Sequence, residues 1–137
     1  MLTKEDIILL FLEDPLKLET EIFKENVPKS DEIRTLICEL GNPWCAYRHA
    51  RNIDKGPTNE TRTVTCKDPG YAYWYARDVD QNPHPETREA CCKKPWEAYQ
   101  YAVSVDKRPT KETRQAAYKD KEVKDWYEQW ENSLKKI

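Results

Sequence analysis

The sequence predicts an all-α protein, built as a right-handed α-solenoid of about four to five stacked helical hairpins with a capping helix at each end. Three observations support this fold class. A repeat of 26 residues opens at Pro43, Pro69 and Pro95. Apolar residues recur inside each repeat at helical spacing. A charged fraction of 35% with only 3 Gly is typical of helices with solvated faces.

Each of the three clear repeats, residues 43–68, 69–94 and 95–120, is expected to begin with a helix at its proline. Asn42 and Asp68 precede two of these prolines and have side chains suited to an N-cap, while proline suits the first helical position. The apolar positions i, i+3, i+4 and i+7 then form one helix face. They are Ala46, His49, Ala50 and Ile53; Ala72, Tyr75, Ala76 and Val79; and Ala98, Tyr101, Ala102 and Val105.

A second helix is expected after Pro57, Pro83 and Pro109. It carries the shared tripeptide Glu-Thr-Arg early and a lysine late, a charge order that the helix dipole favours. Each repeat is therefore predicted to be a hairpin of two helices of about ten residues.

The same pattern continues toward both ends. Residues 15–42 form a degenerate repeat, in which Asp14-Pro15 matches Asp68-Pro69 and a segment from Pro28 matches the second helix. Residues 1–14 are predicted to be an N-terminal capping helix that starts with a Thr3–Asp6 capping box. Residues 121–137 are predicted to be a C-terminal capping helix with an apolar stripe, shifted by one residue from the repeat, of Val123, Trp126, Tyr127 and Trp130.

The composition favours a cytoplasmic protein of one domain. Five Cys, an odd number without a C-x-x-C pair and without a secretory signal before them, favour a reducing compartment. The apolar run from Ile7 to Leu12 is too short to cross a membrane, which takes about 20 residues. No membrane partner is therefore expected.

No pattern in the sequence predicts an enzyme, a cofactor or a metal. Cys38, Cys66 and Cys92 share one repeat column, and residues one helix spacing apart cannot share a zinc ion. We expect the cysteines to be buried as small apolar residues. His49 is expected to face the core, and His84 to lie in a loop or cap a helix. The common catalytic motifs are lacking.

Charged residues that recur in every repeat allow two interpretations. Asp54, Asp80 and Asp106 end the first helices, and Arg62, Arg88 and Arg114 lie in the second helices. The favoured interpretation is a ladder of salt bridges between hairpins. The alternative is a row of arginines that binds an anion, a nucleotide or a nucleic acid.

Residues that differ between repeats are the better candidates for partner binding. On the first helices, the face opposite the apolar stripe carries arginine and aromatic residues only in the first two repeats. Trp and Arg dominate the energetics of protein interfaces. The candidate partner-binding residues are Arg48, Arg51, Tyr71, Trp74 and Arg77. The alternative is that Tyr71 and Trp74 pack against the next hairpin.

The pattern P-x-x-A-Y-x-Y-A-x-x-V-D-x-x-P-x-x-E-T-R resembles short tandem helical repeats of bacteriophage and bacterial proteins, and more loosely the Sel1 and tetratricopeptide repeats. Tetratricopeptide units are longer, at 34 residues. The resemblance implies an α-solenoid with an adaptor or inhibitor role.

Together, these features predict a non-enzymatic protein–protein interaction module, such as a phage-encoded modulator or inhibitor of a host defence factor. Binding of nucleic acid is the less favoured alternative, because residues 43–137 carry 18 Lys and Arg against 15 Asp and Glu. A third alternative is an architectural subunit of an assembly. The sequence leaves the oligomeric state open.

Overall fold

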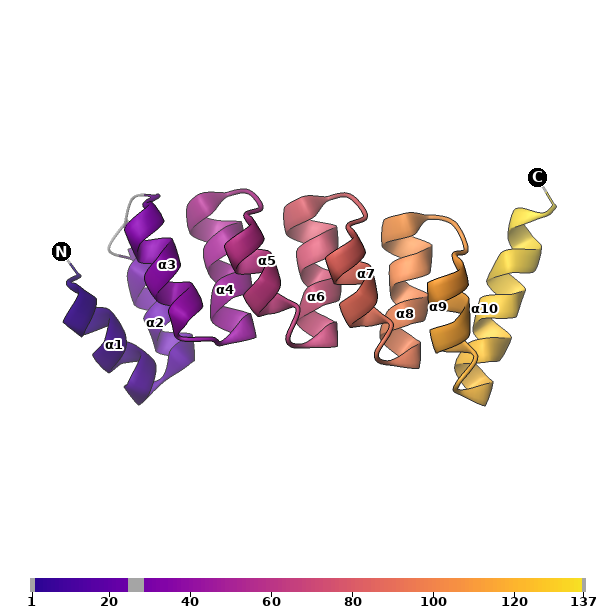
Figure 1. Ribbon diagram of the computed structural model, residues 1–137, viewed down its shortest axis with the longest axis horizontal. Coiled ribbons are helices and arrows are strands. Elements are labelled where there is room, and N and C mark those ends of the chain that lie inside the picture. Colours follow the sequence, from indigo (N-terminus) through magenta and orange to yellow (C-terminus); the bar gives the residue numbers. More distant parts are fainter. Residues whose placement is uncertain (1, 25–28, 137) are drawn as a thin grey trace. The chain divides into compact units, whose positions relative to one another are not determined.

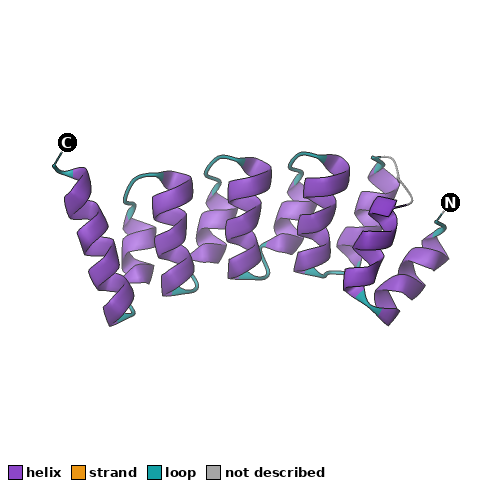
Figure 2. Ribbon diagram, turned by 180° about the vertical axis from the view of Figure 1, so that it is seen from behind, coloured by secondary structure: helices purple, strands orange, loops and turns teal. Residues whose placement is uncertain are grey.

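A computed structural model describes residues 2–24 and 29–136, and every regular element in these two ranges is a helix (Figure 1). No strand occurs in them (Figure 2). The all-α prediction is therefore confirmed. The chain divides into two compact units, Met1–Thr65 and Cys66–Ile137.

The first unit consists of helices α1 (Lys4–Glu13), α2 (Pro15–Lys24), α3 (Asp31–Glu39), α4 (Pro43–His49) and α5 (Asn59–Thr65), with a π-helical turn η1 (Ala50–Asp54) after α4. The Thr3–Asp6 capping box is present at the start of α1, and the Asn42 side chain caps α4, as predicted. The predicted start at Pro28 lies outside the described residues. Ser30 instead caps α3.

The core of the first unit is aliphatic at its N-terminal side. Five fully buried residues from α1 to α4 form one cluster, and Leu10, Phe11 and Trp44 are among the half-buried residues packed around them. The five are Ile7, Leu18, Ile22, Ile37 and Cys45. This cluster holds α2 between α1 and α4, and so places the side chains of α2 inside the unit.

The second unit contains two complete hairpins and a final helix. These are α6 (Pro69–Tyr75) with η2 (Ala76–Asp80) and α7 (Pro85–Cys91), then α8 (Pro95–Tyr101) with η3 (Ala102–Asp106) and α9 (Lys111–Ala117), and lastly α10 (Lys121–Leu134). The helices α6, α8 and α10 contact one another in turn, and α7 contacts α9. Within this unit the first and second helices therefore form two layers (Figure 1).

The alanines of the predicted apolar stripe lie at the contacts between these helices. Ala72, Ala76, Ala98 and Ala102 are all fully buried. A methyl side chain lets the backbones of neighbouring helices approach closely, whereas a longer side chain there would overpack the contact.

Each first helix ends in a π-helical turn, which the sequence analysis did not predict. The residue after this turn, Lys55, Gln81 or Lys107, has a positive φ of 55° to 58°. None of them is glycine, so each residue bears the steric cost of the left-handed conformation. The second helices are also shorter than expected, with seven residues each in α5, α7 and α9.

The stripe predicted for the last helix is corrected in one respect. Val123 and Tyr127 of α10 are buried, but Trp126 is 37% exposed. Tyr127 lies one period after Tyr101 and makes the same hydrogen bond, so α10 keeps the register of the repeat at this position.

Candidate functional site

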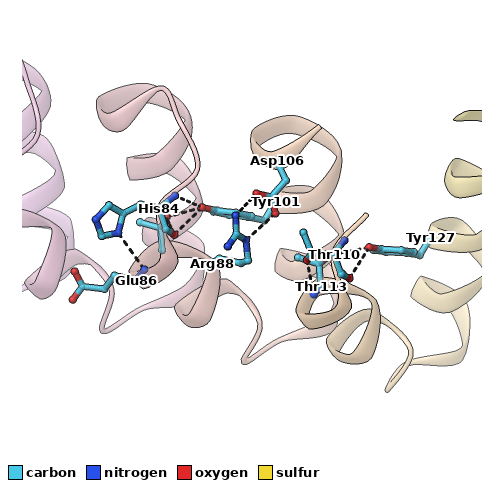
Figure 3. Close-up of polar contacts among 9 residues, drawn as sticks. His84, Glu86, Arg88, Tyr101, Asp106, Thr110, Thr113 and Tyr127 are labelled. Carbon is cyan, nitrogen blue, oxygen red and sulfur yellow. Dashed lines mark hydrogen bonds and ion pairs between the residues drawn. The ribbon is translucent and has the colours of Figure 1, made fainter. Parts of the chain in front are cut away.

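Two polar contacts connect the first hairpin of the second unit to the next one (Figure 3). The Tyr101 hydroxyl on α8 lies 2.8 Å from the Thr87 hydroxyl on α7 and accepts a hydrogen bond from the His84 backbone N–H at 3.0 Å. Beside it, the Arg88 guanidinium donates to both carboxylate oxygens of Asp106, at 3.0 and 2.6 Å. We call such a pair of contacts, Tyr with Thr and Arg with a carboxylate, a joint.

A second joint connects α9 to α10. The hydroxyls of Thr113 and Tyr127 lie 2.8 Å apart, and Arg114 donates to both oxygens of Glu131 at 3.0 and 2.7 Å. The carboxylate here is Glu131, four residues after Tyr127, whereas Asp106 lies five residues after Tyr101 in a π-helical turn that α10 lacks.

The joints decide between the two interpretations of the arginine row at these positions. The predicted ladder is confirmed at Arg88 and Asp106. Bidentate pairing occupies the Nε and Nη2 donors of Arg88 and Arg114. These donors would otherwise be available for a bidentate contact with a bound anion. Arg62 is 7% exposed and donates to Asn59 at 2.8 Å. This geometry gives the anion-binding alternative little support.

In the first unit the joint is altered. Arg34 donates to Asp54 at 2.9 and 3.3 Å, so the arginine–carboxylate contact is kept. Ile33 precedes Arg34 where Thr87 precedes Arg88, and His49 lies five residues before Asp54 where Tyr101 lies five before Asp106. Histidine therefore replaces tyrosine at the joint where the threonine hydroxyl is missing.

His49 belongs to a cluster of polar side chains that are all buried except the half-buried Arg48. We call it the buried polar cluster: Glu19, Arg34, Arg48, His49 and Asp54. The Nδ1 atom of His49 lies 4.0 Å from Oε2 of Glu19 and its Nε2 atom lies 4.0 Å from Oδ1 of Asp54. His49 is 0% exposed and Glu19 is 2% exposed. Within the described part of the chain, both His49 nitrogens, Glu19 Oε1 and Arg48 Nε lack a hydrogen-bond partner.

Burial controls the protonation of two members of the buried polar cluster, Glu19 and His49. Desolvation raises the pKa of Glu19 to about 8, against a smaller opposing effect of the nearby Arg48 charge. Desolvation also lowers the pKa of His49, and the Asp54 carboxylate partly offsets this. At neutral pH, Glu19 is therefore mostly protonated and His49 is uncharged. Because neither side chain reaches the surface, this pair offers no face to a dissolved substrate.

Three of the five members, Arg48, His49 and Asp54, were singled out from the sequence, though not as one cluster. The expectation that His49 faces the core is confirmed. Glu19 was missed, although a signal was available. When Pro15 is aligned with Pro43 and Pro69, Glu19 falls at the repeat position of Tyr47 and Tyr73. A carboxylate differs from the aromatic residues at that position.

Two of the predicted partner-binding residues lie in the first unit. Arg48 is half-buried, with its guanidinium 5.0 Å from the centre of the Trp44 ring. Arg51 is exposed and donates to the Tyr47 hydroxyl at 3.5 Å. Arg51 is thus the more accessible of the two cations.

The other three predicted residues lie together in the second unit. Tyr71 and Trp74 of α6 meet edge to face with ring centres 5.4 Å apart, and Trp74 is 43% exposed. Arg77 is exposed, forms a bidentate pair with Asp78 at 2.8 and 3.0 Å, and stacks over Tyr73.

The second unit has further exposed aromatic residues that sequence analysis missed. Trp96 of α8 is 44% exposed, and its ring centre lies 5.2 Å from that of Trp126 on α10. Tyr99 contacts both rings. The third repeat therefore also presents aromatic groups, at positions outside the face that was considered for binding. We call Tyr71, Trp74, Trp96, Tyr99 and Trp126 the aromatic surface.

Trp74 and Trp126 are two periods apart in the sequence. They therefore occupy equivalent positions on α6 and α10, and Gln100 holds the same position on α8 between them. The aromatic surface thus follows the layer of first helices, α6, α8 and α10, within the second unit.

The cysteines and His84 have structural roles in the described residues. None of the five cysteines forms a disulfide. Cys45 and Cys91 are buried as expected, but Cys38, Cys66 and Cys92 are only half-buried. Burial raises the pKa of Cys38 and Cys92 to about 11 and that of Cys45 to about 12, which disfavours the reactive thiolate. His84 caps α7, as predicted, by accepting the Glu86 N–H at 3.1 Å.

Comparison with protein-family models, curated proteins and solved structures found no match to this chain. Among the described helices, none has the length and apolar character needed to cross a membrane. In the same residues, no group of three or more His, Cys, Asp or Glu side chains is arranged to hold a metal ion.

Proposed function

We propose that this chain is a non-enzymatic protein-interaction module that binds its partner mainly through the aromatic surface. The observation that carries the proposal is the exposure of Trp74, Trp96 and Trp126, at 43%, 44% and 37%. Three of the five Trp of the chain thus offer ring surface to solvent. Tryptophan is the side chain most enriched among residues that dominate binding energy at protein interfaces.

The finer architecture is part of the same proposal. The 26-residue period and the joints support a right-handed α-solenoid. Arg48 and Arg51 of the first unit are further candidate partner-binding residues. The resemblance to bacteriophage and bacterial repeat proteins supports a cytoplasmic modulator or inhibitor of a host factor, including a defence factor.

The test is affinity capture with tagged protein from the native host, followed by a binding measurement with the purified partner. Replacing Arg51 and Trp74 together by Ala is expected to weaken binding at least tenfold while the melting temperature stays within a few degrees. Truncation of interface anchors typically costs about 2 kcal/mol or more each. Trp96→Ala is expected to weaken binding as well.

Arg88→Ala provides the control, because it alters a joint and leaves the aromatic surface intact. It is expected to lower stability and to leave binding unchanged at temperatures where the variant stays folded. If instead Arg88→Ala stays folded and loses binding while the double variant binds normally, the arginine row is the site. A steep decrease of affinity with salt would then identify a nucleic acid as the ligand.

A third outcome would favour an architectural role. If sedimentation shows that the purified protein assembles with itself as its concentration rises, and the Trp96→Ala variant does not, the aromatic surface joins copies of the chain.

A further inference from the structure

A second surface, separate from the aromatic surface, lies on the first unit along α1. The apolar run from Ile7 to Leu12 buries only one of its sides. Leu9 and Leu12, three residues apart on α1, are 65% and 73% exposed, and Leu16 at the start of α2 is 55% exposed. Residues three and four apart share one side of a helix, so Leu9 and Leu12 form a continuous apolar strip. These three leucines leave apolar surface in water that a partner could cover.

Two grooves run beside this helix. One lies between α1 and α2 and has a volume of about 440 Å³. Its apolar lining residues are Leu2, Leu9 and Leu10. The other lies between α1 and α3 and has a volume of about 680 Å³. Its apolar lining residues include Ile7 and Leu36. Both grooves therefore combine an apolar floor with room for side chains of a partner.

The walls of both grooves are acidic. Asp6, Glu13 and Glu21 line the first groove against the single cation Lys17. Three carboxylates, Asp31, Glu32 and Glu39, line the second against the single cation Lys4. The surrounding sequence has the same sign, since residues 1–42 carry 10 Asp and Glu against 5 Lys and Arg.

Charge decides among the possible occupants. A symmetric contact with a second copy would place this acidic surface against itself, and like charges across an interface oppose binding. An anionic lipid surface is disfavoured for the same reason. A segment with leucine-like side chains on one face and Lys or Arg beside them complements both the apolar floors and the acidic walls.

We propose that α1 and its two grooves are a docking site for a basic amphipathic helix of a partner protein. This inference goes beyond the function proposed above, because its residues lie in the first unit and include none of the aromatic surface.

The experiment uses the full chain and two fluorescently labelled peptides of about 14 residues, the length of about four helical turns. Both peptides carry Leu at i, i+3, i+4 and i+7. One has Lys at its polar positions and the other has Glu. The Lys peptide is expected to bind in fluorescence anisotropy, with an affinity that decreases as salt is added. The Glu peptide is expected to bind at least tenfold more weakly.

Variants then locate the peptide. Replacing Leu9 and Leu12 together by Gln is expected to weaken binding of the Lys peptide at least tenfold. The matched control is Leu134→Gln, which changes a leucine of the second unit that is 38% exposed and is expected to have no effect. The variant Trp74→Ala is also expected to bind the Lys peptide normally, which separates this site from the aromatic surface.

Three results would overturn the proposal. The first is that the Lys peptide does not bind, or binds no better than the Glu peptide. The second is that the Leu9 and Leu12 variant binds it as well as the original chain, while circular dichroism shows the same helix content. The third is a dimer in sedimentation that this variant abolishes, which would make a second copy the occupant.

Discussion

The Nδ1 atom of His49 lies 4.0 Å from the Oε2 atom of Glu19, and both side chains are withdrawn from solvent. Burial moves their pKa values in opposite directions, upward for Glu19 and downward for His49. Each group therefore binds protons differently in the folded and unfolded states, which links the stability of the first unit to pH.

The first prediction concerns the alkaline side of this linkage. The pKa of Glu19 is about 8 in the folded protein, against an ordinary value of 4.5. The stability that this difference contributes is fully present below pH 4.5 and is lost as pH rises through 8. Above pH 6.5, His49 is uncharged in the folded state, while the remaining charge of the unfolded histidine, with its ordinary pKa of 6.5, gives a smaller slope of opposite sign that fades as pH rises. The free energy of unfolding should thus decrease between pH 6.5 and 8 by up to about 1.4 kcal/mol per pH unit.

Urea unfolding followed by circular dichroism measures this slope. Glu19→Gln keeps the shape of the side chain and removes its titration, so the variant should show a flatter profile over the same pH range. An identical slope in the two proteins would mean that Glu19 does not titrate in this window.

The second prediction concerns the altered joint of the first unit. His49→Tyr alone should destabilise the protein, because the larger ring meets Ile33 in place of a threonine hydroxyl. Adding Ile33→Thr rebuilds the Tyr–Thr contact seen at Tyr101 and Thr87. A double-mutant cycle should give a favourable coupling of about 0.5–1.5 kcal/mol, the net worth of one hydrogen bond. Simple additivity would show that the two positions are not in contact.

The third prediction compares two arginines of the second unit. Arg88→Ala leaves the carboxylate of Asp106, whose side chain has no solvent exposure, without its charged partner. We expect a loss of about 2–3 kcal/mol in the free energy of unfolding. Arg114→Ala should cost less than about 1 kcal/mol, because that side chain is 42% exposed and its pairing is screened by water. Equal losses at the two positions would contradict this ranking by burial.

The fourth prediction uses the left-handed residue at the end of a π-helical turn. Lys107 has a φ of 58°, a conformation that glycine adopts without steric cost. Lys107→Gly should raise the free energy of unfolding by about 0.5–1 kcal/mol, while the branched Lys107→Val should lower it. Thermal unfolding of both variants checks the sign, and a stabilised Val variant would refute the strained backbone.

The fifth prediction concerns helix contacts. Ala102 is fully buried against Ala117, Val123 and Tyr127. Ala102→Leu should lower the free energy of unfolding by about 1–3 kcal/mol, because the added atoms have no space at this contact. Chemical denaturation measures the loss. An unchanged stability would mean that α8 can shift away from its neighbours at little cost.

Local signals in the sequence predicted much of the helical structure. The caps at Thr3, Asn42 and Asp68 depend on residues close in the chain, and all three form as predicted. The salt-bridge ladder could also be predicted, since a contact that recurs with the period leaves the same residues in every repeat.

Other features depend on the packing of side chains from distant segments, and the sequence alone did not reveal them. The π-helical turns bring Asp54 and Asp106 toward arginines of the preceding hairpin. Because this contact joins distant segments, no local sequence pattern predicts the turns. Trp96 directly follows the proline that starts its helix, outside the face considered for binding, so its exposure was missed. Glu19 was missed because it lies in the degenerate repeat, whose alignment with the clear repeats is harder to recognise.

The joints also bear on how such a chain can change its length during evolution. Duplicating residues 69–94 would give a new hairpin whose Thr and Arg meet Tyr101 and Asp106, and whose own Tyr and Asp meet Thr87 and Arg88. Every new junction would use chemistry already present in the protein. Gene duplication could therefore add or remove whole hairpins in the second unit without compensating mutations. The His49 junction of the first unit lacks this interchangeability, so duplication of this kind applies to hairpins of the second unit.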